Sequence, residues 1–261
     1  MNVQQTTELP DLRQRLPPIA DFTEFVPDPN VVRDNNIVGF HSRNAAARPF
    51  NLLRTQVAKR CTQEGWKAIG VTSAEPGAGK SFVSLNLAAA LSRVENQSVY
   101  LFDLDLSRAS VAKALNMDVA PGLADYLAGQ ADDLAAIGRR IAGHNLAVFP
   151  TGNWEGSTAS LFSGARFADL ATMMRNAPDG TIVICDLPPV FANDDAMIIA
   201  QSLDAYLAVV NSGETNHKQL AETFAMLEPT PRLGTILNRY KGGFADPYGY
   251  GSYSKAYKSY Y

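Results

Sequence analysis

The chain contains one run of residues whose types and order could hold the phosphates of a nucleotide. It reads Ala-Glu-Pro-Gly-Ala-Gly-Lys-Ser over residues 74–81, between an apolar stretch expected to be a strand and a stretch expected to be a helix. Glycines let backbone N–H groups turn inward, and the helix N-terminus adds partial positive charge, so the run predicts a phosphate-binding loop. Lys80 would bridge the β- and γ-phosphates, and the Ser81 hydroxyl would ligate Mg²⁺. The predicted nucleotide contacts in and beside the loop are Glu75, Pro76, Gly77, Ala78, Gly79, Lys80, Ser81 and Phe82.

Three aspartates stand where predicted strands end. Asp103 and Asp105 follow the apolar run 99–102, and Asp186 follows the apolar run 181–185. Residues two apart on a strand point to the same side, so Asp103 and Asp105 can both face the phosphate site at the carboxyl edge of a sheet. Paired carboxylates there can hold Mg²⁺ or accept a hydroxyl proton. Asp186 is predicted to bind Mg²⁺ directly or through water, because Mg²⁺ takes few carboxylates and keeps several waters.

The C-terminal segment is unusually rich in tyrosine. Six of the ten tyrosines fall between residues 248 and 261, namely Tyr248, Tyr250, Tyr253, Tyr257, Tyr260 and Tyr261. Residues 241–261 also hold many glycines and serines, and such a composition predicts a flexible tail because it cannot bury a core. A phosphate-binding loop and a string of hydroxyls on one chain suggest a kinase that modifies its own tail. Two other interpretations stay open: a sticky extension without chemistry, and a weak aromatic-basic contact with nucleic acid or anionic lipid.

The elements that must position these residues follow an alternating pattern. Short β-rich apolar runs alternate with helical periods, which predicts an α/β fold with a doubly wound, mostly parallel sheet and helices on both faces. Residues 1–40 hold five prolines and no clear period, so they are expected to form an extended arm before a domain over residues 41–240. The predicted strands are 68–72, 98–102, 146–149, 181–185, 205–210 and 234–237. The predicted helices are 42–63, with Pro49 at either its true start or a break, and 81–94, 110–115, 132–141, 165–176, 195–201 and 217–227.

Composition and charge narrow the classes of function. The 261 residues are 46% hydrophobic and 19% charged, which suits one sizeable core. A net charge of −3 gives no general basic field, so no nucleic-acid partner is expected. Without an apolar run of about 20 residues or a signal-peptide core, the chain is expected to be cytoplasmic. Cys61 and Cys185 are too few for a disulfide framework and are expected to be reduced.

Four segments resemble the bacterial tyrosine kinases (BY-kinases), within the larger MinD/ParA-like group of P-loop ATPases. They are Glu-Pro-Gly-Ala-Gly-Lys-Ser at 75–81, Phe-Asp-Leu-Asp at 102–105, Ile-Cys-Asp-Leu-Pro-Pro at 184–189 and Leu-Asn at 237–238. The resemblance covers roughly residues 57–238 and the tyrosine-rich tail. It implies a catalytic set of Lys80, Asp103 and Asp105, a magnesium set of Ser81, Asp103 and Asp186, and an adenine contact at Asn238. The run 121–127, Pro-Gly-Leu-Ala-Asp-Tyr-Leu, and the acidic turn 194–196 also resemble family segments.

The chain departs from the family pattern at two places. The helix before the loop reads Arg-Pro-Phe-Asn-Leu-Leu-Arg at 48–54, so only Arg54 remains of the EX2RX2R pattern that supports the family's ring-shaped oligomer. Ser107, followed by Arg108, occupies the position of a family arginine after the second carboxylate. The resemblance therefore leaves a homo-oligomer possible without predicting the usual ring.

The resemblance implies an ATP- and Mg²⁺-dependent tyrosine autokinase that regulates polymerisation and export of an exopolysaccharide or capsule. Its implied partners are a transmembrane polysaccharide copolymerase that activates it as a separate chain, and a phosphotyrosine phosphatase. Such a partner would recruit the protein to the inner face of the cell membrane. The alternative is a MinD/ParA-like ATP-binding switch or scaffold without tyrosine transfer. The tail, and the absence of a lysine at the early loop positions Ala74, Glu75 and Pro76, favour the kinase.

Overall fold

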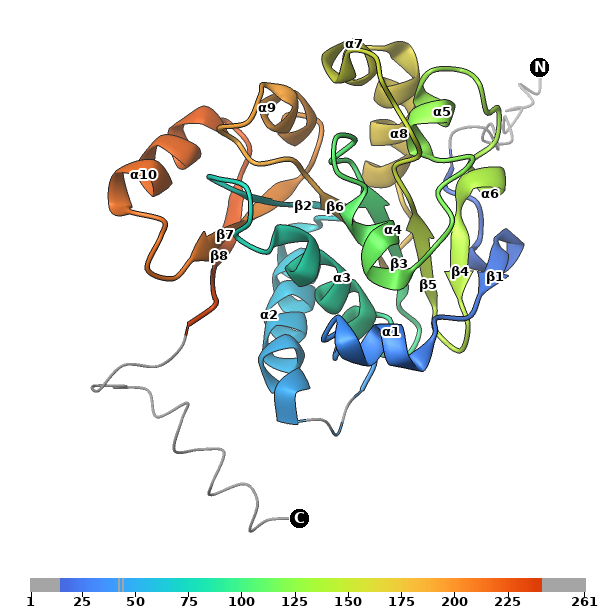
Figure 1. Ribbon diagram of the computed structural model, residues 1–261, viewed down its shortest axis with the longest axis horizontal. Helices are drawn as coiled ribbons and strands as arrows, with labels where there is room; N and C mark the ends of the chain where they lie inside the picture. Colours follow the sequence, from blue (N-terminus) through green and yellow to red (C-terminus); the bar gives the residue numbers. More distant parts are fainter. Residues whose placement is uncertain (1–14, 42, 44, 241–261) are drawn as a thin grey trace, which may run out of the picture.

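The protein, seen in a computed structural model, is an eight-stranded sheet covered by helices on both faces (Figure 1). The structure describes residues 15–41, 43 and 45–240. The strands are β1 (Thr23–Phe25), β2 (Ala68–Ser73), β3 (Ser98–Asp103), β4 (Arg139–Ile141), β5 (Leu146–Phe149), β6 (Thr181–Asp186), β7 (Ala205–Asn211) and β8 (Arg232–Asn238). The α-helices are α1 (Pro29–Asp34), α2 (Arg48–Glu64), α3 (Lys80–Leu91), α4 (Ser110–Leu115), α5 (Leu123–Leu127), α6 (Leu134–Ile137), α7 (Thr158–Phe162), α8 (Ala165–Arg175), α9 (Asp195–Ala200) and α10 (His217–Met226).

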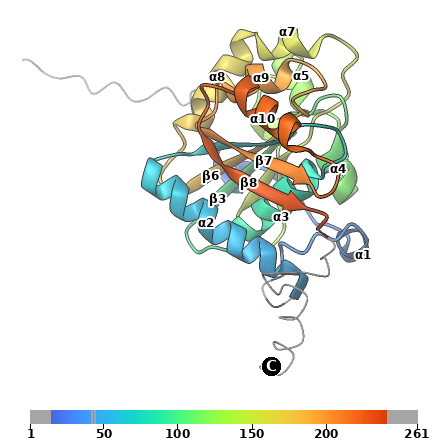
Figure 2. The same ribbon diagram turned by 90° about the vertical axis from the view of Figure 1, so that its left-hand side faces the viewer.

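The strand order is β1-β4-β5-β3-β6-β2-β7-β8, and the pairings among the described strands are parallel except that of β4 with β5. The α/β, mostly parallel doubly wound sheet predicted from the sequence is confirmed. Strand β2, which leads into the phosphate-binding loop, lies between β6 and β7. Strand β8 forms one edge of the sheet, and Figure 2 looks toward it.

The two faces of the sheet bury different helices because side chains alternate along each strand. In β3, Val99 and Leu101 pack in the cluster that contains α2 and α3. Tyr100 and Phe102 point into the opposite cluster, with α5, α8 and Phe149. The rings of Phe102 and Phe149 stack with centroids 4.1 Å apart. Strand β3 thus supports helices on both of its faces.

Helix α2 begins later than the sequence predicts. It starts at Arg48 with Pro49 in its first turn, so Pro49 marks the true start of the helix and not a break. Proline suits this place because the N–H that it lacks would have had no helical partner there. Gly65, in the left-handed conformation, ends the helix.

The predicted helix 132–141 is wrong over its last residues. Asp133 caps α6 by accepting from the N–H of Ala135, and the helix already ends before the extended residue Gly138. The chain then forms β4, whose Arg140 makes an ion pair of 2.7 Å with Glu24 of β1. Three residues with two arginines carry no strand pattern, so only the pairing between distant segments reveals β4.

The N-terminal segment differs from the predicted extended arm over residues 19–34. It forms a short 3₁₀ turn at Ile19–Asp21, then β1 and α1. Its side chains Leu16, Ile19 and Phe22 are buried in the cluster of the α8 face, while Val32 belongs to the α3 face. This segment is therefore part of the folded core.

The sequence does not predict helices α5 and α7, because each spans only five residues.

The described helices include none with the length and hydropathy to reach across a bilayer.

Replacing Phe22 with alanine is expected to lower the free energy of unfolding by about 3 kcal/mol, because a buried ring is removed and a cavity remains. Phe22 contacts the rings of Phe149 and Tyr100 at centroid distances of 5.2 and 6.3 Å. Urea denaturation measures the change. Val26→Ala is the control, since Val26 is exposed and should change stability by no more than about 0.5 kcal/mol. Equal effects of the two substitutions would show that the N-terminal segment does not contribute to the core.

Candidate functional site

The phosphate-binding loop lies between the carboxyl end of β2 and the first residue of α3. Gly77 and Gly79 have φ of 85° and 92°, a region that favours glycine. A Cβ on Gly79 would lie 2.2 Å from Nδ2 of Asn238. Two features favour glycine at position 79, its backbone conformation and the close approach of the Asn238 side chain.

Lys80, the first residue of α3, points into a cluster of carboxylates. Its side chain is buried, and Nζ donates a hydrogen bond of 2.5 Å to Oδ2 of Asp105. Burial alone would lower the pKa of Lys80, but the charges of Asp186, Asp105 and Asp103 and the hydrogen bond to Asp105 raise the pKa above its usual value. Lys80 is therefore a charged ammonium group at neutral pH.

Asp103 and Asp186 end the neighbouring strands β3 and β6 and are direct partners in their register. Both are completely buried. Oδ2 of Asp103 accepts from the N–H of Val111 at 3.0 Å, and Oδ1 of Asp186 accepts from the Ser84 hydroxyl at 3.1 Å. The second oxygen of each carboxylate is buried without a hydrogen-bond partner among the described residues.

Burial of these two carboxylates disfavours their charged forms. It raises the pKa of Asp103 well above the usual value, and the nearby charge of Asp186 raises it further, against the opposing hydrogen bond from Val111. Burial also raises the pKa of Asp186, against the charge of Lys80 and the neighbouring hydroxyls of Ser81 and Ser84. The site therefore holds more acidic groups than its one ammonium group can pair with, and it favours a further proton or cation.

The donor set fits a magnesium ion held jointly by protein and nucleotide. Asp103 and Asp186 each offer one oxygen without a partner, and the Ser81 hydroxyl lies within reach of Asp186. In the described part of the chain, no three His, Cys, Asp or Glu side chains are grouped to hold a metal by themselves. Mg²⁺ commonly takes one or two carboxylates plus substrate phosphates, so this set suits that ion.

Two side chains from distant elements lie against the loop. Asn238, at the end of β8, donates from Nδ2 to the carbonyl oxygen of Ala78 at 2.8 Å. Glu75 bonds to the side chain of Gln219 in the first turn of α10. The predicted contact Asn238 is thus beside the loop. Phe82 is partly exposed and packs against Phe50 of α2 with centroids 5.6 Å apart.

The segment after β6 is attached to the start of the loop. The N–H groups of Val190 and Phe191 donate to the carbonyl oxygens of Ser73 and Ala74 at 2.8 and 3.0 Å. The segment ends at Asp195, a buried carboxylate that accepts from Thr158. The acidic turn 194–196 therefore fixes the end of the segment that follows Asp186, through the hydrogen bond from Thr158 to Asp195.

The structure brings together at the phosphate-binding loop the charged residues that the sequence singles out. Lys80, Asp103, Asp105 and Asp186 form one buried group, with Ser81 beside Asp186. Ser84 was not predicted, although it is one turn after Lys80 on the same helix and could have been found by that spacing. Gln219 has no sequence signal, since only packing of α10 brings it to Glu75. The tail tyrosines Tyr248, Tyr250, Tyr253, Tyr257, Tyr260 and Tyr261 lie outside the described residues.

Comparison with known proteins identifies the domain. Residues 69–248 match the family described as the CobQ/CobB/MinD/ParA nucleotide binding domain. The chain is 31% identical to tyrosine-protein kinase CpsD of Streptococcus pneumoniae serotype 4 over 194 residues, which cover 73% of this chain and 82% of that protein. It is 31% identical to tyrosine-protein kinase ptk of Acinetobacter johnsonii over 72% of this chain, but spans only 25% of that relative's length.

The fold is also that of solved kinase structures. The kinase domain of Escherichia coli tyrosine kinase ETK superimposes with a TM-score of 0.69 and 23% sequence identity. The alignment covers 80% of this chain and 83% of the other. At this level of identity the likeness concerns the fold alone.

Gly79→Ala is expected to lower affinity for ADP with Mg²⁺ by at least about tenfold. The left-handed backbone and the clash with Asn238 together should cost more than about 1.4 kcal/mol, which corresponds to that factor. Isothermal titration calorimetry measures the change. Gly65→Ala is a matched control, since Gly65 is also left-handed (φ 72°) but a Cβ there meets no atom within 4 Å. If both variants bound ADP like the unmodified protein, the tight contact between the loop and Asn238 would not matter for binding.

Asp103→Asn is expected to stabilise the nucleotide-free, magnesium-free protein increasingly as pH rises. The folded state raises the pKa of Asp103 above its unfolded value of about 3.9, so the folded state binds the proton more tightly. The stability that this proton gives is complete below that unfolded value and is lost as pH rises through the folded pKa. Asparagine keeps an acceptor for the N–H of Val111 and carries no charge.

The measurement is the difference in melting temperature between Asp103→Asn and the unmodified protein, recorded from about pH 5 to pH 8 in a chelator. The difference should grow with pH. The exposed Asp169→Asn is the control for loss of a carboxylate elsewhere on the protein. A constant difference for Asp103→Asn would contradict the raised pKa.

Proposed function

The chain belongs to the bacterial tyrosine kinases (BY-kinases) within the CobQ/CobB/MinD/ParA nucleotide-binding group, and from this membership we propose that it is an ATP-dependent protein-tyrosine autokinase acting on its own C-terminal tyrosines. The observation that carries the proposal is the buried group at the end of β3 and β6. It combines the ammonium group of Lys80, the carboxylate of Asp105 in contact with it, and two carboxylate oxygens without partners. These are the groups that phosphoryl transfer requires.

The loop and Lys80 bind and orient the triphosphate. Phosphoryl transfer needs little covalent chemistry from a protein, so positioning and charge stabilisation supply most of the catalysis. Lys80 is charged and bonded to Asp105. When phosphates enter the loop, their negative charge competes with Asp105 for the ammonium group. Ser84 and the N–H of Val111 meanwhile keep Asp186 and Asp103 in place.

Mg²⁺ bound by Ser81, Asp103 and Asp186 would neutralise charge on the transferred phosphoryl group. Asn238 would contact the adenine, since its side chain lies beside the loop.

Asp105 is the proposed acceptor of the tyrosine proton. A tyrosine hydroxyl has a pKa of about 10 and is protonated at neutral pH, so a carboxylate must orient it and take its proton. The tyrosine oxygen forms a bond to the γ-phosphorus, the bond from that phosphorus to the bridging oxygen of ADP breaks, and the proton passes to Asp105. An Asp105 released by Lys80 has the free oxygen that this step needs.

The acceptors are Tyr248, Tyr250, Tyr253, Tyr257, Tyr260 and Tyr261, reached within one chain or from a neighbouring copy in a homo-oligomer. Each phosphate adds close to two negative charges, so a modified tail repels its neighbours and can loosen an assembly. The resemblance supports a role in exopolysaccharide or capsule polymerisation and export. It also supports a transmembrane copolymerase as activator, a phosphotyrosine phosphatase as antagonist, and a location in the cytoplasm at the inner face of the membrane.

Incubation with ATP and Mg²⁺ is expected to add phosphate to the chain in steps of one phosphate mass. Intact-mass spectrometry measures the additions, and fragmentation assigns them to the six tail tyrosines. Lys80→Met should abolish them, and truncation after Lys241 should remove the acceptors. Lys113→Met, a change of an exposed lysine on α4, is the matched control and should leave phosphorylation intact.

The cytoplasmic segment of a candidate copolymerase is added in a parallel arm. A chain that binds ATP yet stays unmodified with this activator present would disprove the autokinase and support the nucleotide-dependent switch.

Asp105→Asn is expected to slow phosphorylation by at least about 10²-fold, because general-base catalysis contributes about 10² to 10⁴. Binding of ADP with Mg²⁺ should persist in this variant. The exposed Asp169→Asn controls for loss of a charge elsewhere. An unchanged rate in Asp105→Asn would assign the proton to another group.

A further inference from the structure

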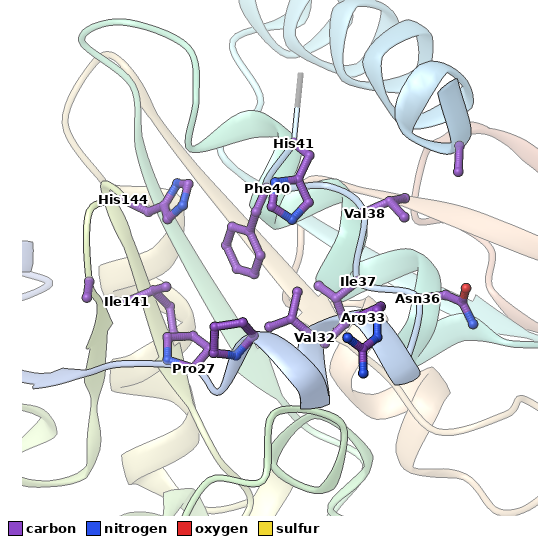
Figure 3. A pocket seen from close by; sticks show the side chains of 13 residues that line it. Pro27, Val32, Arg33, Asn36, Ile37, Val38, Phe40, His41, Ile141 and His144 are labelled. Carbon is purple, nitrogen blue, oxygen red and sulfur yellow. The ribbon is translucent and has the colours of Figure 1, made fainter. Parts of the chain in front are cut away.

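A cavity of about 380 Å³ lies far from the phosphate-binding loop, between α1, the segment 36–41 and the β4–β5 turn (Figure 3). The turn is at the amino end of β5, whereas the loop follows the carboxyl end of β2, and these strands run parallel through β3 and β6. The cavity is therefore at the opposite end of the sheet from the proposed kinase site. Its volume is within the range of about 300 to 1,000 Å³ typical of small-molecule sites.

The walls of the cavity combine apolar surface with basic side chains. Val32, Ile37, Val38, Phe40 and Ile141 provide most of the apolar lining. The basic groups are Arg33 from α1, His41 from the segment 36–41 and His144 from the turn. The rings of Phe40 and His144 touch, with centroids 4.6 Å apart. Figure 3 shows Val32, Phe40 and His144 coming together from three separate elements.

The described lining of the cavity has basic groups and no acidic ones. None of the lining residues that the structure describes has a carboxylate. Arg33 makes an ion pair of 3.0 Å with Asp34, but both side chains are well exposed, and such surface pairs contribute little. Burial lowers the pKa of His144, and the positive charges of Arg93 and His41 lower it further. An anion in the cavity would relieve this crowding of basic groups.

The walls are also held in place before any ligand binds. Gly39 donates its N–H to Oδ1 of Asn86 on α3 at 2.9 Å, and a Cβ on Gly39 would lie 2.2 Å from the carbonyl oxygen of Asn86. Ile37 is buried against the α3 face. Asp28 caps α1 by accepting from Asn30 at 2.8 Å. A ligand therefore loses little affinity to ordering of the protein.

From these four observations we propose that the cavity binds a small amphipathic anion, an apolar ring that carries a phosphate or carboxylate group. The ring packs between the aliphatic side chains and Phe40. The anionic group lies toward Arg33, whose guanidinium pairs with either group in two parallel hydrogen bonds, and toward the two imidazoles. The proposal stands on the cavity alone and does not depend on tyrosine transfer.

The test is a titration of the full chain, saturated with ADP and Mg²⁺ so that the phosphate-binding loop is occupied. The probes are phenyl phosphate, benzoate, inorganic phosphate and benzyl alcohol, followed by ligand-observed NMR. A ring with an anionic group should bind at least about tenfold more tightly than inorganic phosphate or benzyl alcohol. The ratio between phenyl phosphate and benzoate tells which anionic group the site prefers.

Two variants and two matched controls assign the binding to this cavity. Arg33→Gln and His144→Gln should each weaken the preferred probe by about tenfold, the usual effect of losing a hydrogen bond to a charged group. Arg175→Gln on α8 and His217→Gln on α10 change exposed residues elsewhere and should have no effect. Melting curves check that all four variants fold.

Three results would overturn the proposal. They are no saturable binding up to about 10 mM, equal binding of phenyl phosphate and benzyl alcohol, and unchanged affinity in folded Arg33→Gln and His144→Gln. If Arg33→Gln or His144→Gln is unfolded, Ala142→Leu replaces it, because it fills the cavity from the turn without removing a charge. Undiminished binding in folded Ala142→Leu would equally place the probe elsewhere.

Discussion

The arrangement of the site follows from the imbalance of buried charge around Lys80. One ammonium group stands among three carboxylates at and just beyond the ends of β3 and β6, and all four groups are buried. A buried charge is costly unless it is paired and hydrogen-bonded. The N–H of Val111 donates to Asp103 and the hydroxyl of Ser84 donates to Asp186, which offsets part of this cost. One oxygen of each carboxylate has no partner among the described residues. These two oxygens make the site attractive to a cation that arrives with a nucleotide.

The parallel sheet makes this charge cluster possible. Strands β2, β3 and β6 end at the same edge, and their register sets Asp103 directly beside Asp186. The loop after β2 then brings Lys80 over both carboxylates. Elements from the other side of β2 complete the surroundings, because Asn238 of β8 and Gln219 of α10 contact the loop. The phosphate site thus depends on strand pairing as much as on its own motif.

The sequence predicts those parts of the protein whose signals are local. The loop, the three aspartates and the six core strands combine a motif with apolar periodicity over neighbouring residues. Strand β4 could not be predicted, because Arg139 and Arg140 extend only through pairing with β1 and β5. The burial of the N-terminal segment could not be predicted either, because Phe22 is buried by Gly138 and Phe149, which lie more than 100 residues away in the sequence. The contact of Gln219 with Glu75 likewise depends on the docking of a whole helix.

The strand order also determines when the phosphate site can form during synthesis of the chain. The loop is made early, yet β2 pairs with strands that begin at Thr181 and Ala205. Until those strands leave the ribosome, β2 is an apolar segment without neighbours, and the loop lacks the frame that shapes it. Asn238 arrives last of all, within the final strand. A nascent chain therefore cannot hold a nucleotide until nearly the whole domain has emerged. Nucleotide binding thus follows completion of the fold.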